Sequence, residues 1–128
     1  MKTKAVDAEK RIKILVVDDE QVVRDFLGRL LTLKSAIVKI VEDGFRAIEA
    51  VKQERFDIVF LDVKMPQMDG LETFRELKKI DPQAKYVMMT GYAVDDILTE
   101  AQQEGLFHFI RKPFDIDQIT SLIESHIS

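Results

Sequence analysis

The chain has 128 residues and no cysteine, and its 19 basic and 23 acidic side chains give a net charge of −4. The length fits one domain, and the lack of cysteine excludes a disulfide scaffold, a thiolate metal site and a cysteine nucleophile. The acidic balance argues against nucleic-acid binding through this domain, and no apolar run approaches the roughly 20 residues that span a bilayer. We therefore expect a soluble cytoplasmic protein with no membrane contact.

The first half of the chain alternates between short apolar runs and helical periodicity. Residues 1–10 are polar and aperiodic, which predicts a flexible N-terminal arm ahead of a single domain over residues 11–128. The runs are rich in β-branched residues, as in buried strands, and the segments between them carry apolar residues at helical spacing. The predicted elements are a strand over 12–17, a helix over 22–31, a strand over 36–41, a helix over 44–51 and a strand over 56–61.

The second half continues this alternation after a loop over 63–70, in which Pro66 and the pair Asp69–Gly70 favour turns. The predicted elements are a helix over 71–80, a strand over 84–89, a helix over 94–101, a strand over 106–111 and a helix over 116–127. Gly105 is typical of a helix C-terminus. Asp115 followed by Gln118 predicts a capping box at the start of the last helix.

Five strands in alternation with five helices predict a parallel sheet. Right-handed crossovers then place helices on both of its faces, which gives a doubly wound α/β fold. We find no internal repeat and no second domain in this sequence.

Polar side chains stand where the predicted strands end, which is where parallel sheets bind ligands. Asp18 and Asp19 follow the first strand, Asp62 the third, Thr90 the fourth and Lys112 the fifth. Three carboxylates with no histidine or cysteine favour Mg²⁺ or Mn²⁺. A lysine and a hydroxyl suit phosphate oxygens, and a carboxylate can accept a phosphoryl group. The pattern indicates Mg²⁺-dependent phosphoryl transfer onto a carboxylate.

These motifs together resemble the receiver domain of two-component response regulators, in the CheY-like superfamily. They are Asp18–Asp19 after a β-branched strand, Asp62 with Met65–Pro66 and Met68–Asp69–Gly70 behind it, Thr90–Gly91, and Lys112–Pro113–Phe114. The resemblance covers residues 11 to 127. It implies a flavodoxin-like sheet with strand order 2-1-3-4-5 and the site at its topological switch point.

The resemblance also implies a role for each residue of the acidic cluster. Asp62 is the expected phosphoacceptor. Asp19 and Asp62 are expected to bind Mg²⁺ directly, Asp18 through water, and the backbone carbonyl of Lys64 as a further ligand.

Three more residues match the family's switch. Thr90 is expected to contact the phosphoryl group after transfer, and Lys112 to pair with it. Phe109 matches an aromatic side chain that turns inward on activation. The family usually has a cis peptide bond before the proline that matches Pro113, and the last two helices with the strand between them are expected to change shape.

The expected partners follow from the same resemblance. A sensor histidine kinase or a phosphotransfer protein donates the phosphoryl group, and a downstream output domain or protein receives the signal. The family often forms homodimers through the face made by the last two helices and the fifth strand, so a homodimer is one state that the resemblance allows. Such a domain assists its own phosphorylation and dephosphorylation but is not an ordinary enzyme.

Three alternatives stand beside this interpretation. A flavodoxin-like flavin carrier needs a Gly/Ser/Thr-rich loop after the first strand, where this chain has two aspartates. A haloacid dehalogenase-type phosphohydrolase needs a second aspartate at the position of Lys64. A degenerate receiver would dock partners without phosphorylation. Within the receiver interpretation, Lys64 and Tyr92 flank the site, and we expect them to slow hydrolysis of the phosphoryl group.

Overall fold

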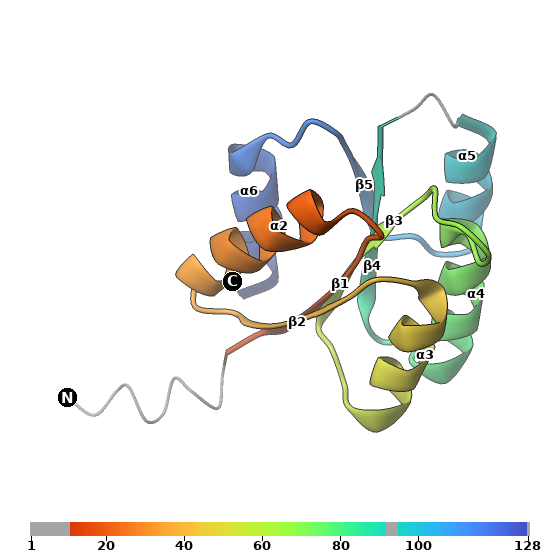
Figure 1. Cartoon of the computed structure of the whole chain (residues 1–128), viewed down its shortest axis with the longest axis horizontal. Coiled ribbons are helices and arrows are strands. Elements are labelled where there is room, and N and C mark those ends of the chain that lie inside the picture. The colour runs from red at the N-terminus through yellow and green to blue at the C-terminus, as the bar shows by residue number, and fades with distance from the viewer. Residues whose placement is uncertain (1–10, 92–94, 128) are drawn as a thin grey trace.

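The computed structural model describes residues 11–91 and 95–127, which form one parallel sheet with helices on both faces (Figure 1). The strands are β1 (Lys13–Val17), β2 (Ile37–Val41), β3 (Ile58–Asp62), β4 (Lys85–Thr90) and β5 (His108–Arg111). The helices are α2 (Gln21–Leu33), α3 (Gly44–Gln53), α4 (Gly70–Ile80), α5 (Asp95–Gln103) and α6 (Ile116–Ile127). The strand order is β2-β1-β3-β4-β5, which confirms the predicted doubly wound fold. The arm predicted over 1–10 lies outside the described residues.

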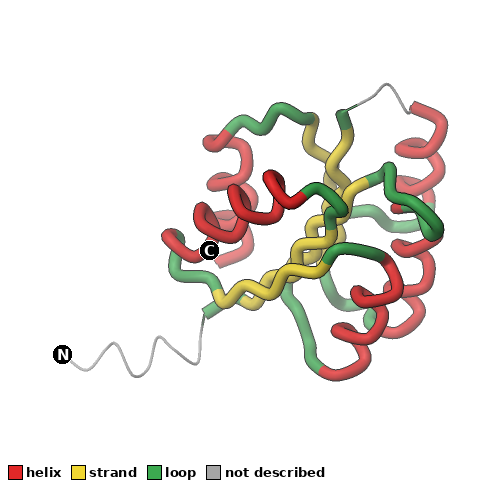
Figure 2. The backbone as a smooth tube through the Cα atoms, viewed as in Figure 1, coloured by secondary structure: helices red, strands yellow, loops and turns green. Residues whose placement is uncertain are grey.

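The two helical layers are unequal. Helices α2 and α6 cover one face of the sheet, and α3, α4 and α5 cover the other (Figures 1 and 2). Alternate residues of one strand serve the two layers, because successive side chains point to opposite faces. Val16 packs into the cluster that contains Leu27 and Ile119, whereas Leu15 packs into the cluster that contains Phe74. This double burial explains why residues 14–17 of β1 form an unbroken apolar run.

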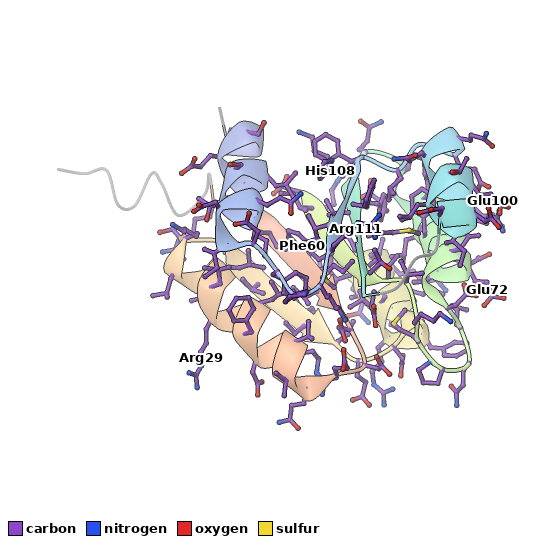
Figure 3. The ribbon with its side chains drawn as sticks, turned by 90° about the horizontal axis from the view of Figure 1, so that it is seen from above. Arg29, Phe60, Glu72, Glu100, His108 and Arg111 are labelled. Atoms are coloured by element: carbon purple, nitrogen blue, oxygen red, sulfur yellow. The ribbon has the colours of Figure 1, made fainter. Side chains whose placement is uncertain are left out.

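Phe60 on β3 is fully buried near the middle of the sheet, and Arg29 on α2 points away from it (Figure 3). The apolar pattern of α2 extends beyond its buried face, since Val22 is 80% exposed. Among the described strands, β2 pairs with β1 alone and lies at the edge of the sheet, where Ile37 and Ile40 are about two-fifths exposed. Periodicity alone does not predict these exposed apolar positions.

The ends of the helices test the predicted caps. The Gly105 backbone has φ +99°, and the Leu106 N–H donates to the Ala101 carbonyl, as expected for a glycine helix terminus. The Asp115 carboxylate accepts a hydrogen bond from the Asp117 N–H at 2.9 Å, while the Gln118 N–H donates to the Asp115 main-chain carbonyl. The side-chain cap thus reaches the second residue of α6, and the predicted pairing with the third is wrong.

A reciprocal capping box forms instead at the start of α4. The Asp69 carboxylate accepts from the Glu72 N–H at 2.9 Å, and the Glu72 carboxylate accepts from the Asp69 N–H at 3.1 Å. Two N–H groups that the helix itself leaves unpaired are satisfied by this exchange. The start of α4 is therefore fixed directly after the loop that follows β3. Among the described residues, no helix has the length and apolar character needed to cross a membrane.

Candidate functional site

Three carboxylates meet at the carboxyl edge of the sheet. Val17 lies opposite Leu61 in the register of β1 and β3, so the residues that follow them, Asp18 and Asp62, are neighbours. Oxygens of Asp18, Asp19 and Asp62 all lie within 4.8 Å of one another. Asp18 and Asp62 are buried and Asp19 is exposed, so the cluster opens to solvent on one side.

Lys112 crosses the end of β4 to reach this cluster. Its N–H donates to the Thr90 carbonyl at 2.7 Å, which places the residue directly beyond β5. Its Nζ atom lies 2.9 Å from Asp18 Oδ2, 3.1 Å from Glu20 Oε1 and 3.4 Å from Asp62 Oδ1. One ammonium group thus contacts three carboxylates that come from two different strand ends.

Burial and repulsion perturb the titration of the site. Burial, reinforced by the charge of Asp18, raises the pKa of Asp62 to about 7. Burial also raises the pKa of Asp18. Burial alone would lower the pKa of Lys112, but its hydrogen bond to Asp18 and the other carboxylate charges outweigh this and raise it. The carboxylates of Asp18, Glu20 and Asp62 outnumber the Lys112 ammonium that they contact, so the cluster favours an added cation.

Two residues that the sequence analysis missed hold Asp18 in place. The Glu20 N–H donates to Asp18 Oδ1 at 2.8 Å, and an Arg24 Nη donates to the Asp18 carbonyl at 2.9 Å. Glu20 carries a signal that could have been noticed. It precedes the first turn of α2 directly, where the short side chains of Ser, Thr, Asp or Asn are usual. Arg24 carries no comparable signal.

The loop after β3 approaches the site closely. The Gly70 N–H donates to the Val63 carbonyl at 2.8 Å, and a Cβ atom at Gly70 would lie 2.4 Å from the Asp62 carbonyl oxygen. Gln67 has φ +70°, and the Met68 N–H donates to the Pro66 carbonyl across it, which forms a tight γ-turn. The absence of a side chain at Gly70 therefore lets the loop lie against the strand end that carries Asp62.

A cleft of about 280 Å³ lies over these groups. Its lining residues are Asp19, Glu20, Asp62, Lys64, Gly91 and Lys112. The cleft is large enough for a small anion and its counter-ion, and both carboxylates and lysine side chains line it. Lys64 is exposed at this cleft, and Tyr92 lies outside the described residues.

The predicted switch residues lie one step away from the cleft. Thr90 ends β4 and is buried, and Phe109 on β5 is half-buried beside Arg111, whose guanidinium carbon lies 5.7 Å from the ring centroid. Phe109 lies opposite Met88 in the register, and Met88 and Thr90 point to the same face of the sheet. Thr90 and Phe109 therefore share one face. The Lys112–Pro113 peptide bond is cis, as the family resemblance implied.

The donor set fits a hard divalent cation. All three clustered ligands are carboxylate oxygens, and the described surroundings add no thiolate or imidazole to the cluster. Such a set suits Mg²⁺ or Mn²⁺, which also leave positions for water and phosphate oxygens. The arrangement can hold a cation, place a buried carboxylate beside it and offer an ammonium to an incoming anion.

Comparison with known proteins agrees with this geometry. Sporulation initiation phosphotransferase F of Bacillus subtilis is 34% identical over 115 residues, which cover 90% of this chain and 93% of that protein. The transcriptional regulator NtrC of Escherichia coli is also 34% identical over 90% of this chain, but the match spans only 24% of NtrC.

Solved structures give the same result. A CheY-like receiver domain protein from Methanospirillum hungatei superposes with a TM-score of 0.87 at 26% identity, over 91% of this chain and 94% of that one. NtrX from Brucella abortus superposes with a TM-score of 0.83 at 30% identity, over 91% of this chain and 27% of that one. Residues 14–124 match the sequence profile described as the response regulator receiver domain. The chain therefore belongs to the receiver domain family of two-component response regulators.

Proposed function

We propose that this receiver domain accepts a phosphoryl group on Asp62 in a Mg²⁺-dependent reaction. The observation that carries this proposal is the buried Asp62 carboxylate, which faces a cleft between two further aspartates and the ammonium of Lys112. Asp19 and Asp62 are the proposed direct metal ligands, Asp18 acts through water, and the backbone carbonyl of Lys64 completes the set. The bound cation supplies positive charge that offsets the carboxylates and the incoming phosphoryl oxygens.

The side chains around Asp62 have different roles in the proposed phosphoryl transfer. A carboxylate oxygen of Asp62 forms the new bond to phosphorus while the leaving group departs from the opposite side. Lys112 donates to a phosphoryl oxygen, since it already lies 3.4 Å from Asp62 Oδ1. Thr90 donates to another, and its movement lets the half-buried ring of Phe109 turn inward. The face made by α5, β5 and α6 then presents a different surface to an output domain or protein.

The proposed donor is a phosphohistidine on a sensor histidine kinase or a phosphotransfer protein. α2 begins directly beside the acidic cluster, and its outer side leaves Val22 80% and Phe26 38% exposed. The Phe26 ring stacks on Phe114, with centroids 6.0 Å apart, next to the loop that carries Lys112. This apolar surface beside the cleft suits a protein donor that must bring its phosphoryl group to Asp62.

The two kinds of relative suggest two ways in which the signal leaves. The Bacillus protein is named a phosphotransferase, and the match covers nearly its full length. NtrC is named a DNA-binding transcriptional regulator, and the match covers about a quarter of it. The domain proposed here serves either as a relay or as the input part of a regulator, and in both cases phosphorylation of Asp62 is the first step.

Intact-mass spectrometry tests this proposal. We expect one phosphoryl adduct after incubation with Mg²⁺ and acetyl phosphate, and no adduct on Asp62→Asn or in EDTA. An adduct that persists on Asp62→Asn would place the acceptor elsewhere. The absence of an adduct on the unmodified protein, with both acetyl phosphate and a phosphohistidine protein, would favour a docking domain that works without phosphorylation.

A further inference from the structure

Glu20 differs from the other two carboxylates that contact Lys112. Asp18 and Asp62 are buried, and their side chains are 0% and 7% exposed. The Glu20 side chain is 62% exposed, yet its Oε1 lies 3.1 Å from Lys112 Nζ. An exposed and flexible carboxylate is the one of the three that can leave Lys112 without breaking the packing around it.

The Glu20 carbonyl accepts a hydrogen bond from the Arg24 N–H at the start of α2, but the Glu20 side chain does not cap this helix. Glu20 occupies the N-cap position of α2, but its side chain makes no capping hydrogen bond. It reaches instead to Lys112, 92 residues away in the sequence. The Glu20 N–H donates to Asp18 Oδ1, which fixes the point from which the side chain starts. A capping residue would stabilise the helix, so the glutamate is explained by its contact with Lys112.

The phosphoryl group must compete for the position that Glu20 occupies. The ammonium of Lys112 has three protons, and three carboxylates already surround it. A phosphoryl group on Asp62 brings up to two negative charges and three acceptor oxygens. It would be repelled by Glu20 and attracted by Lys112, so the exposed glutamate is the partner that gives way.

We propose that Glu20 is a specificity-determining residue that holds the phosphoryl position at Lys112 and disfavours doubly charged phosphodonors. This inference rests on the proposed phosphorylation of Asp62. The reaction with acetyl phosphate forms a P–O bond from Asp62, breaks the donor's P–O bond and releases acetate with the electron pair. The reaction with phosphoramidate breaks a P–N bond, and the protonated nitrogen leaves as ammonia with the electron pair. Acetyl phosphate is doubly charged at neutral pH and phosphoramidate is singly charged, so Glu20 repels the first more strongly.

The test compares the initial phosphorylation rates with these two donors at saturating Mg²⁺. Glu20→Gln keeps the shape of the side chain and removes its charge. We expect it to raise the ratio of the acetyl phosphate rate to the phosphoramidate rate by about two- to five-fold, the range for one exposed charge interaction. Glu42→Gln is the matched control, because Glu42 is exposed just beyond β2 and does not contact Lys112. It should leave the ratio unchanged.

A second readout separates this role from metal binding. Mg²⁺ affinity measured by calorimetry should be almost the same in Glu20→Gln and in the unmodified protein, because the Glu20 carboxylate is assigned to Lys112. An unchanged donor ratio, an equal shift in Glu42→Gln or a large loss of Mg²⁺ affinity in Glu20→Gln would each overturn the inference while leaving phosphorylation intact. No adduct from either donor on any variant would overturn the proposed function, and this inference with it.

Discussion

At the scale of single residues, Asp62 is the proposed phosphoacceptor, and its charged form is unfavourable where it lies. Its carboxylate is buried beside Asp18, and its pKa rises from 3.8 to about 7. A carboxyl group whose pKa is higher in the folded protein than in the unfolded chain lowers stability as the pH rises between these two values. The destabilisation comes first from the burial of the Asp62 carboxylate and then from the charge of Asp18, and the proposed acceptor role needs the same buried position beside other carboxylates.

The stability of Asp62→Asn measures this cost. In EDTA at pH 8 we expect the variant to be more stable than the unmodified protein by about 2–4 kcal/mol, because the neutral amide removes a buried charge and its repulsion by Asp18. The difference should shrink as the pH falls below 7 and disappear only well below pH 3.8, where Asp62 is protonated in both the folded and the unfolded state. Urea unfolding followed by circular dichroism at several pH values gives the comparison. A difference that does not depend on pH would assign the gain to packing instead of charge.

The site could be predicted from the sequence only in part. Asp18, Asp62 and Lys112 follow apolar runs, and the edge of a parallel sheet gathers such positions whatever their separation in the chain. The roles of Glu20 and Arg24 depend on where their side chains point: Glu20 reaches Lys112, and Arg24 reaches the Asp18 carbonyl. Spacing along the sequence contains no information on that direction, so contacts of this kind appear only in three dimensions.

At the scale of secondary-structure elements, the predicted order was confirmed and the ends were less accurate. β3 begins two residues later than its apolar run and includes Asp62, since pairing with β4 continues to that residue. β5 is short for a related reason: its pairing with β4 starts only at His108. Apolar runs report burial, whereas strands are defined by pairing, so the two differ at the edges.

Two glycines at helical positions differ in the space that a side chain would have. A Cβ atom at Gly70 would lie 2.4 Å from the Asp62 carbonyl oxygen. One at Gly28, within α2, would have its nearest neighbour outside the helix backbone, Ile40 Cδ1, at 4.0 Å. We expect Gly28→Ala to raise the free energy of unfolding by about 0.5–1 kcal/mol. We expect Gly70→Ala to lower it by at least about 1–3 kcal/mol, since the backbone of the strand end must move.

Chemical unfolding of both variants checks these signs, and the rate of Asp62 modification by acetyl phosphate checks the consequence for the site. Gly70→Ala should also slow this reaction, because the displaced backbone carries the acceptor. Gly28→Ala should leave the rate of Asp62 modification unchanged, since a Cβ atom at Gly28 has room and displaces no neighbouring atom. A Gly70→Ala protein of normal stability and rate would show that the loop after β3 adapts without moving Asp62.

At the scale of the whole molecule, the site and the proposed output face are separate but continuous. Thr90 ends β4 directly before Gly91, which lines the cleft, and Phe109 lies on the same face of the neighbouring strand. Phe109 is only half-buried and lies beside Arg111, so the proposed inward turn would bury more of its ring and change this contact. In the proposed switch, the added charge at Asp62 shifts a two-state equilibrium in α5, β5 and α6.

Hydrogen exchange detects such a shift over the described fold. On phosphorylation with Mg²⁺ and acetyl phosphate, we expect amide exchange in β5 to slow by about five-fold or more, as Phe109 packs inward and local opening becomes rarer. Exchange in β2 and α3 should not change. β2 pairs with β1, whereas Thr90 and Phe109 lie in the paired strands β4 and β5. Thr90→Ala should still gain the phosphoryl mass yet lose the slowing in β5, since the link between the two residues is removed. Equal slowing in Thr90→Ala, or slowing spread evenly over all five strands, would contradict a switch that passes through Thr90 and Phe109.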